Sequence, residues 1–214
     1  MKETNIYLIR HGESLGNAKR IYLGHTDLDL SPFGYEQAKI AAERLRDVKF
    51  DVIYSSDLLR AHNTAVPHAE LRGLDIIDSP LLREIYLGDW ENRLVDELVN
   101  NEYDKFVVGW KENFGTFTVP GGESVIGAGT RFYNEVLRIA RENEGKTILI
   151  TAHAAVIRVF WCIINQIRPE DMASAYPFPK NASHTTAIFD GERIIPGVYS
   201  SENRPESSDG GDSE

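Results

Sequence analysis

Apolar residues along the chain form short continuous runs, and most of these runs are separated by longer amphipathic stretches. Runs of this kind are typical of buried strands, and the amphipathic stretches between them are typical of helices. Strands are expected at Asn5–Ile9, Asp51–Tyr54, Leu74–Asp78 and Thr147–Thr151, with a closing hairpin of Thr185–Phe189 and Arg193–Val198. Helices are expected over 31–48, from about 58 to a bend or end at Pro67, and over 91–113, 124–144 and 154–167.

Two of the expected helices carry clear start signals. Ser31 is followed by Pro32, which combines an N-cap residue with a proline in the first turn. Ser124 similarly precedes the longest amphipathic stretch. Strands that alternate with helices indicate an α/β fold of three layers, in which a mainly parallel sheet has helices on both faces.

The 214 residues suit one domain, and no internal repeat or linker divides them. We expect a single domain over residues 1–200. Residues 201–214 carry five acidic groups and one arginine, and this polar tail is expected to be disordered.

Charged and polar side chains follow three of the predicted strands. Arg10-His11 ends the first strand, Ser55-Ser56-Asp57 with Arg60 follows the second, and His153 follows the strand at 147–151. In open α/β sheets, ligands bind outside the carboxyl ends of the strands. Two imidazoles and two guanidinium groups are therefore expected to meet at one rim of the sheet.

The net charge of −10 argues against nucleic acid or an anionic membrane as the main partner, because basic surfaces hold both. An anionic substrate would need a locally basic pocket. The single cysteine, Cys162, lies on an apolar helix and is expected in the core. The most apolar segment, 154–167, is interrupted by Arg158 and is too short to span a bilayer. A cytoplasmic protein is expected.

Six groups of residues resemble the signature motifs of the histidine phosphatase superfamily, also called phosphoglycerate mutase-like. They occur in the family's order along nearly the whole chain. The groups are Leu8–Ser14 with Asn17; Gly24–Asp27 with Leu30-Ser31 and Gly34; Ser55–Leu58 with Arg60-Ala61 and Thr64-Ala65; Leu82–Glu84 with Gly88–Glu91; Pro120–Ser124; and Thr151–His153 with Ile157-Arg158.

The resemblance implies a phosphoglycerate mutase-like fold and two catalytic groups. His11 is expected to attack the phosphorus of a phosphomonoester and to carry the phosphoryl group as phosphohistidine. Glu84 is expected to protonate the leaving oxygen and later to take a proton from water. Spacing alone does not choose Glu84 over Asp89 or Glu91; the family pattern does.

The resemblance and the rim position also assign the phosphate-binding groups. Arg10, Arg60 and His153 are expected around the phosphoryl oxygens, because phosphoryl transfer depends on positioning and charge neutralisation. The amides that begin the helix after His153, from Ala154 onward, point toward an anion and add partial positive charge. Ser14 and Asn17 are further candidates, and capping a local helix is an equal alternative for both.

One position departs from the family pattern. Ala154-Ala155 stand where the family usually has glycines. Alanine keeps the amide donor, so function is expected to survive, although a tight phosphate fit is less certain. No cofactor is implied, and no zinc-like spacing of histidine with cysteine is present. His25 and His184 are treated as surface or packing residues that could also line the mouth of the pocket.

Three functions fit these residues. The favoured one is a metal-independent phosphatase acting on a small phosphorylated metabolite. The second is a phosphoglycerate mutase, which is disfavoured because residues 84–120 lack the neighbouring arginine pair that holds the substrate carboxylate in mutases. The third is a non-catalytic phosphate-binding module. The substrate stays open, and so does the oligomeric state, for which a homodimer is one option.

Substrate specificity is expected to depend on the segment 91–120, which should cover the site. Trp90, directly before this segment, and four aromatic residues within it are candidates for contact with substrate, and packing against one another is the alternative for them. They are Trp90, Tyr103, Trp110, Phe114 and Phe117.

Overall fold

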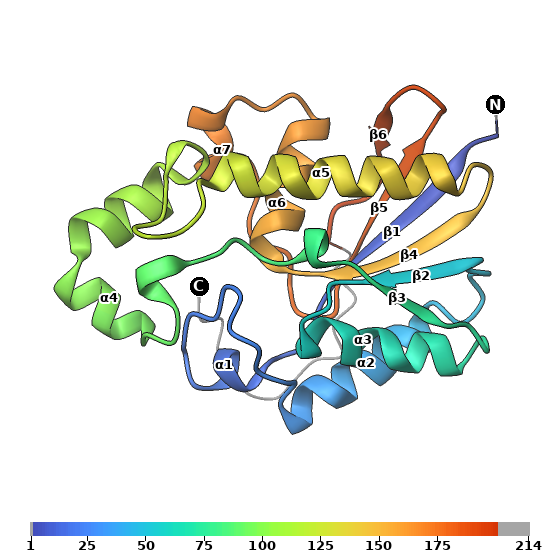
Figure 1. Ribbon diagram of the computed structural model, residues 1–214, viewed down its shortest axis with the longest axis horizontal. Coiled ribbons are helices and arrows are strands. Elements are labelled where there is room, and N and C mark those ends of the chain that lie inside the picture. Colours follow the sequence, from blue (N-terminus) through green and yellow to red (C-terminus); the bar gives the residue numbers. More distant parts are fainter. Residues whose placement is uncertain (1, 201–214) are drawn as a thin grey trace.

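The computed structural model describes residues 2–200, and the predicted acidic tail lies outside these residues. A six-stranded sheet of order β3-β2-β4-β1-β5-β6 forms the centre of the molecule (Figure 1). Four neighbouring strands, from β3 to β1, are parallel to one another. At one edge, β5 pairs antiparallel with β1, and β6 pairs antiparallel with β5. The strands are β1 Thr4–Arg10, β2 Val52–Ser55, β3 Ile76–Asp78, β4 Thr147–Ala152, β5 His184–Phe189 and β6 Ile194–Pro196.

Helices cover both faces of this sheet, as the sequence predicted. In Figure 1, α5 and α6 lie on one face and α2 and α3 lie on the other. The α-helices are α1 Leu15–Ala18, α2 Pro32–Arg44, α3 Leu59–Glu70, α4 Val95–Asn101, α5 Val125–Glu142, α6 Ala154–Ile164 and α7 Met172–Ala175. A π-helical segment spans Asp104–Glu112, and single 3₁₀ turns lie at Pro80–Leu82, Gly88–Trp90, Phe114–Thr116 and Pro169–Asp171.

The strand pattern places side chains alternately in two cores. Ile6 and Leu8 of β1 pack with α5 and α6, whereas Ile9 packs with α3 and with Leu45, the residue after α2, on the opposite face. This alternation follows from the two-residue period of a strand. A strand that is buried on both faces needs apolar residues at successive positions, which explains the continuous runs in the sequence.

Local start signals fixed several helix boundaries. The hydroxyls of Ser31 and Ser124 accept hydrogen bonds from the amides of Gly34 and Gly127, so both N-caps are confirmed. A bend or an end was expected at Pro67, and the end is wrong, because α3 continues to Glu70. The proline lies in the last turn, where its own carbonyl still accepts a hydrogen bond from the Leu71 amide.

Two further expectations concern the helical stretch 91–113 and the position of Cys162. The predicted helical stretch 91–113 divides into α4 and the π-helical segment, and both lie at one end of the molecule beyond the sheet (Figure 1). Cys162 is fully buried, and burial raises the pKa of its thiol to about 11, which fits the core position expected for it.

Candidate active site

The carboxyl ends of β1, β4 and β2 lie side by side. Arg10 pairs with Ala152, and Thr151 pairs with Ser55. His11 and His153 each follow directly after a strand, and their ring centroids are 5.2 Å apart in an edge-to-face arrangement. Both rings are almost completely buried. The parallel register therefore brings together the two histidines that the sequence placed at strand ends.

His11 is held in one tautomer by its own chain. Its Nδ1 lies 2.6 Å from the Gly12 carbonyl oxygen, which can only accept, so Nδ1 carries the proton and donates. Burial lowers the pKa of His11 well below 6.5, and the charges of Arg60 and Arg10 lower it further. The ring is consequently neutral at cellular pH, and Nε2 keeps a free lone pair.

His153 has a different set of contacts. Its Nε2 is 2.8 Å from the hydroxyl of Ser56, and its buried Nδ1 has no hydrogen-bond partner among residues 2–200. Burial, followed by the charge of Arg60, lowers the pKa of His153 well below 6.5. The ring is therefore neutral at cellular pH, and the positive charge of this rim belongs to the arginines.

Arg60 is 2% exposed, and backbone carbonyls hold its guanidinium group. Nη1 donates to Thr26 O at 2.8 Å, and Nη2 donates to Gly24 O at 2.7 Å. The loop that supplies these carbonyls is itself fixed by Glu91, whose carboxylate accepts from the backbone amide of His25 and the Thr26 hydroxyl, each at 2.6 Å. Glu91 thus orders the Arg60 site.

Arg10 is bound in a similar way. Its Nη1 donates to the Pro179 carbonyl at 2.6 Å, and its buried Nε has no partner within the described residues. Burial lowers the pKa of Arg10 and of Arg60 to about 10, and Glu84 is the carboxylate that opposes this most strongly in both cases. Two guanidinium groups bound by carbonyls keep their positive charge, so this rim is electropositive within an acidic protein.

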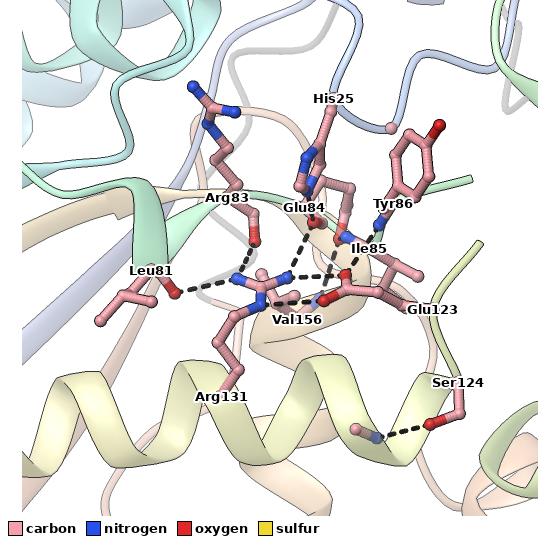
Figure 2. A network of polar contacts seen from close by, with 12 residues as sticks. His25, Leu81, Arg83, Glu84, Ile85, Tyr86, Glu123, Ser124, Arg131 and Val156 are labelled. Atoms are coloured by element: carbon pink, nitrogen blue, oxygen red, sulfur yellow. Dashed lines mark hydrogen bonds and ion pairs between the residues drawn. The ribbon is translucent and has the colours of Figure 1, made fainter. Parts of the chain in front are cut away.

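Glu84 lies at the N-terminus of α6 (Figure 2). Its carboxylate accepts hydrogen bonds from the amides of Ala155 at 3.0 Å and Val156 at 3.1 Å, and also from Ile85 at 3.0 Å. The sequence interpretation gave the first amides of this helix to a phosphate, but the carboxylate of Glu84 occupies those of Ala155 and Val156. The role of the Ala154 amide stays a prediction.

The remaining candidates have local partners. The hydroxyl of Ser14 accepts from the Asn17 amide at 3.1 Å, and the Asn17 side chain accepts from the Ser14 amide at 3.1 Å, which forms a capping box on α1. Both are engaged in the capping that was the alternative to phosphate binding. Asp89 is exposed in its 3₁₀ turn.

The five aromatic candidates belong to a segment that we call the aromatic cap, residues 90–117. Trp90 and Phe114 are completely buried and Trp110 is 5% exposed. The Trp90 ring stacks on Phe117 at 5.4 Å, and Trp110 meets Phe114 edge-to-face at 5.1 Å. Packing against one another therefore describes most of this set, and Tyr103 is the member with a largely exposed ring.

Several residues outside the predicted site also support the rim. Thr64 accepts from the Gly12 amide at 3.0 Å and donates to the Arg60 carbonyl at 2.7 Å, while the Asn181 side chain donates to the His11 carbonyl at 3.0 Å. His25 donates from Nε2 to the carbonyl of Glu84 at 2.9 Å. Of the side chains that contact the predicted site residues, Ser56, the partner of His153, was the one that the sequence placed at the rim.

Within residues 2–200, no group of three or more His, Cys, Asp or Glu side chains could hold a metal ion. Over the same part of the chain, no helix has the length and apolar character needed to cross a membrane.

Three comparisons relate this geometry to known proteins. Residues 6–198 match the family model of the histidine phosphatase superfamily (branch 1). Phosphoserine phosphatase 1 of Hydrogenobacter thermophilus is 30% identical over 191 residues, 89% of each chain. The protein named "Probable phosphoglycerate mutase GpmB" of Yersinia pestis is 33% identical over 156 residues, 71% of this chain and 70% of its own.

The fold has a similarly good match among solved structures. A mycobacterial glucosyl-3-phosphoglycerate phosphatase in complex with VO3 superposes with a TM-score of 0.84. It is 27% identical, and the match covers 92% of this chain and 98% of that one.

Proposed function

Because the chain belongs to the histidine phosphatase superfamily and is a phosphatase, we propose that it hydrolyses a small phosphomonoester without a metal, through a phosphohistidine formed at His11. The observation that carries this proposal is that the buried Arg60 and the half-buried Arg10 donate to carbonyl acceptors beside a neutral imidazole. Buried charge without a carboxylate partner is costly, and a dianionic phosphoryl group would offset that cost.

In the first step, the Nε2 lone pair of His11 forms a bond to phosphorus while the bond from phosphorus to the ester oxygen breaks. The departing oxygen takes a proton from the carboxyl group of Glu84 and leaves as an alcohol. Arg10 and Arg60 neutralise the equatorial oxygens, and His153 donates a further hydrogen bond from Nδ1.

In the second step, water attacks the phosphorus of the phosphohistidine and the bond to Nε2 breaks. The carboxylate of Glu84 accepts the proton of the water, which restores its carboxyl form for the next cycle. The products are the alcohol and inorganic phosphate. His11 returns to the neutral tautomer that its hydrogen bond to Gly12 favours.

Turnover of p-nitrophenyl phosphate in EDTA tests the reaction class. We expect release of phosphate and an acid-labile phosphoprotein when the reaction is quenched early. With 3-phosphoglycerate, release of phosphate supports the phosphatase. Transfer of the phosphoryl group to the neighbouring hydroxyl without release would instead show a mutase, the activity named for the Yersinia relative.

His11→Asn tests the nucleophile. Turnover should fall by about 10⁴-fold or more and the acid-labile label should disappear, because both depend on the same nitrogen. His62→Asn is the matched control, since His62 is half-buried and paired with Asp78, the last residue of the edge strand β3, rather than with a residue assigned to the reaction. A labelled His11→Asn protein would exclude His11 as the nucleophile.

The cellular setting completes the proposal. A chain with one cysteine, Cys162, forms no disulfide within itself, and this supports a cytoplasmic protein that acts on a small phosphorylated metabolite.

A further inference from the structure

The motif Pro120–Ser124 has no role in the reaction described so far. The turn that it forms packs against residues 86–89: the Asp89 amide donates to Pro120 O, and the Glu123 amide donates to Tyr86 O, each at 2.9 Å. A Cβ at Gly122 would lie 2.3 Å from Tyr86 O, so only glycine allows this approach. The turn therefore places Glu123 beside the segment that follows Glu84.

Arg131 of α5 connects this turn to the backbone around Glu84 (Figure 2). Nη1 donates to the carbonyls of Leu81 at 2.9 Å and Arg83 at 3.0 Å, and Nη2 donates to the carbonyl of Glu84 at 3.1 Å. Glu123 fixes the guanidinium plane by accepting from Nε at 3.1 Å and from Nη2 at 2.9 Å. All three guanidinium nitrogens are thus engaged.

The peptide between Glu84 and Ile85 links these contacts to the carboxyl group. On one side its carbonyl accepts from Arg131 and from His25. On the other side its N–H donates to Oε1 of Glu84. Residues 84–87 belong to no helix or strand, so no regular hydrogen-bond ladder orients this peptide. A rotation of the peptide plane would break the contact with Glu84 Oε1, which is one of the three amide contacts of the carboxyl group, beside those from Ala155 and Val156.

We propose that Arg131 and Glu123 are positioning residues for Glu84, because together they fix the peptide plane from which its carboxyl group reaches the leaving oxygen. This inference rests on the proposed function, in which Glu84 is the general acid. A positioned acid is needed most when the leaving group is a poor one. Disturbing the pair should therefore slow substrates in proportion to their need for a proton.

Two substrates of similar shape separate these effects. p-Nitrophenyl phosphate releases an acidic phenol that leaves with little help, and p-nitrobenzyl phosphate releases an alcohol that needs the proton. For Arg131→Lys and Glu123→Gln, we expect kcat on the benzyl ester to fall about 10- to 100-fold and kcat on the aryl ester to change less than about threefold. Glu84→Gln should show the same selectivity with a larger loss.

A second acid–arginine pair, formed within α5 by Glu135 and Arg138, provides the matched control. Arg138 donates to both carboxylate oxygens of Glu135 at 2.8 Å, and Glu135 accepts from the Ser79 hydroxyl at 2.6 Å, away from Glu84. Arg138→Lys and Glu135→Gln should leave the ratio of the two rates unchanged. Circular dichroism and thermal melts establish that each variant is folded, and Glu123→Gln carries the test if Arg131→Lys does not fold.

The outcomes separate this inference from the proposed function. Equal losses on both esters, or no loss, in the Arg131 and Glu123 variants would show a merely structural pair and overturn the inference. If Glu84→Gln itself lacks selectivity, Glu84 is not the acid, and both the acid assignment and the inference fall. No turnover of the aryl ester by the unaltered protein would overturn the proposed function itself.

Discussion

The rim of the sheet and the aromatic cap both contain side chains that the sequence made candidates for substrate contact, and their burial has opposite meanings. At the rim, His11, His153 and Arg60 are buried polar groups. In the cap, Trp90 and Phe114 are buried apolar rings. Burial costs free energy for the first kind and releases it for the second.

This difference teaches how burial can be used to locate a site. Buried aromatic rings are stabilised by one another, as in the stack of Trp90 on Phe117, so they need no ligand. The guanidinium groups of Arg10 and Arg60 donate to carbonyls and form no direct ion pair among the described residues, and Nε of Arg10 has no partner there. A bound anion would neutralise the charge of these groups. The rim therefore indicates function, whereas the cap indicates packing.

Removing a buried ring of the aromatic cap should lower the stability of the fold more than the rate of the reaction. Phe106 is completely buried and contacts Tyr22 and Trp90 edge-to-face, each at 5.4 Å. Phe106→Ala should lower the free energy of unfolding by about 3–5 kcal/mol, because the cavity loses these contacts. Urea denaturation measures the loss, and Tyr103→Ala, at a ring 56% exposed, should change it by less than about 0.5 kcal/mol.

A large loss of activity in Phe106→Ala would contradict this distinction between the rim and the aromatic cap. If kcat on p-nitrophenyl phosphate at a temperature where Phe106→Ala is folded fell as strongly as it does for rim variants, the cap would take part directly in the reaction.

Replacing a carbonyl-bound arginine at the rim should affect chemistry more than stability. Lysine keeps the charge of Arg60 but cannot donate to Gly24 O and Thr26 O in the same fork geometry. Arg60→Lys should lower kcat/KM for p-nitrophenyl phosphate by about 10²–10³-fold. Arg46→Lys, at an exposed pair with Glu43, should leave it unchanged. If Arg60→Lys kept the full kcat/KM, Arg60 would not be a phosphate-binding residue.

The buried histidines should give the rim a pH signature that the cap, which contains no histidine, lacks. The pKa values of His11 and His153 are lowered below 6.5 by burial, so between pH 6.5 and those values the unfolded chain binds more protons. Stability should therefore fall as the pH decreases below 6.5, by about 1.4 kcal/mol per pH unit for each histidine. Burial also lowers the pKa of His68 to about 3, which adds a contribution of the same sign.

Urea denaturation between pH 7.5 and 5 measures this slope. The variant His11→Asn should have a slope smaller by about 1.4 kcal/mol per pH unit, because asparagine takes up no proton. An identical slope in the variant would mean that His11 is protonated equally in the folded and unfolded chains.

Much of the fold could be predicted from local patterns. The apolar runs of β1 and β4 and the N-caps Ser31 and Ser124 depend on nearest neighbours, so the sequence contains their causes. Of the bend or end expected at Pro67, the end was wrong, because proline is tolerated in a last turn and only the three-dimensional helix defines that position.

By itself the sequence determined the order of the elements and, through the polar residues at three strand ends, which side chains meet at the rim. Parallel strands bring their carboxyl ends to one edge whatever the loops do, so His11 and His153 converge. Only the tertiary structure decided that Gly24 O and Thr26 O bind Arg60, and that Arg131 holds the backbone at Glu84. Every residue has a backbone carbonyl, and which of them becomes an acceptor depends on loops that are ordered only once the chain has folded.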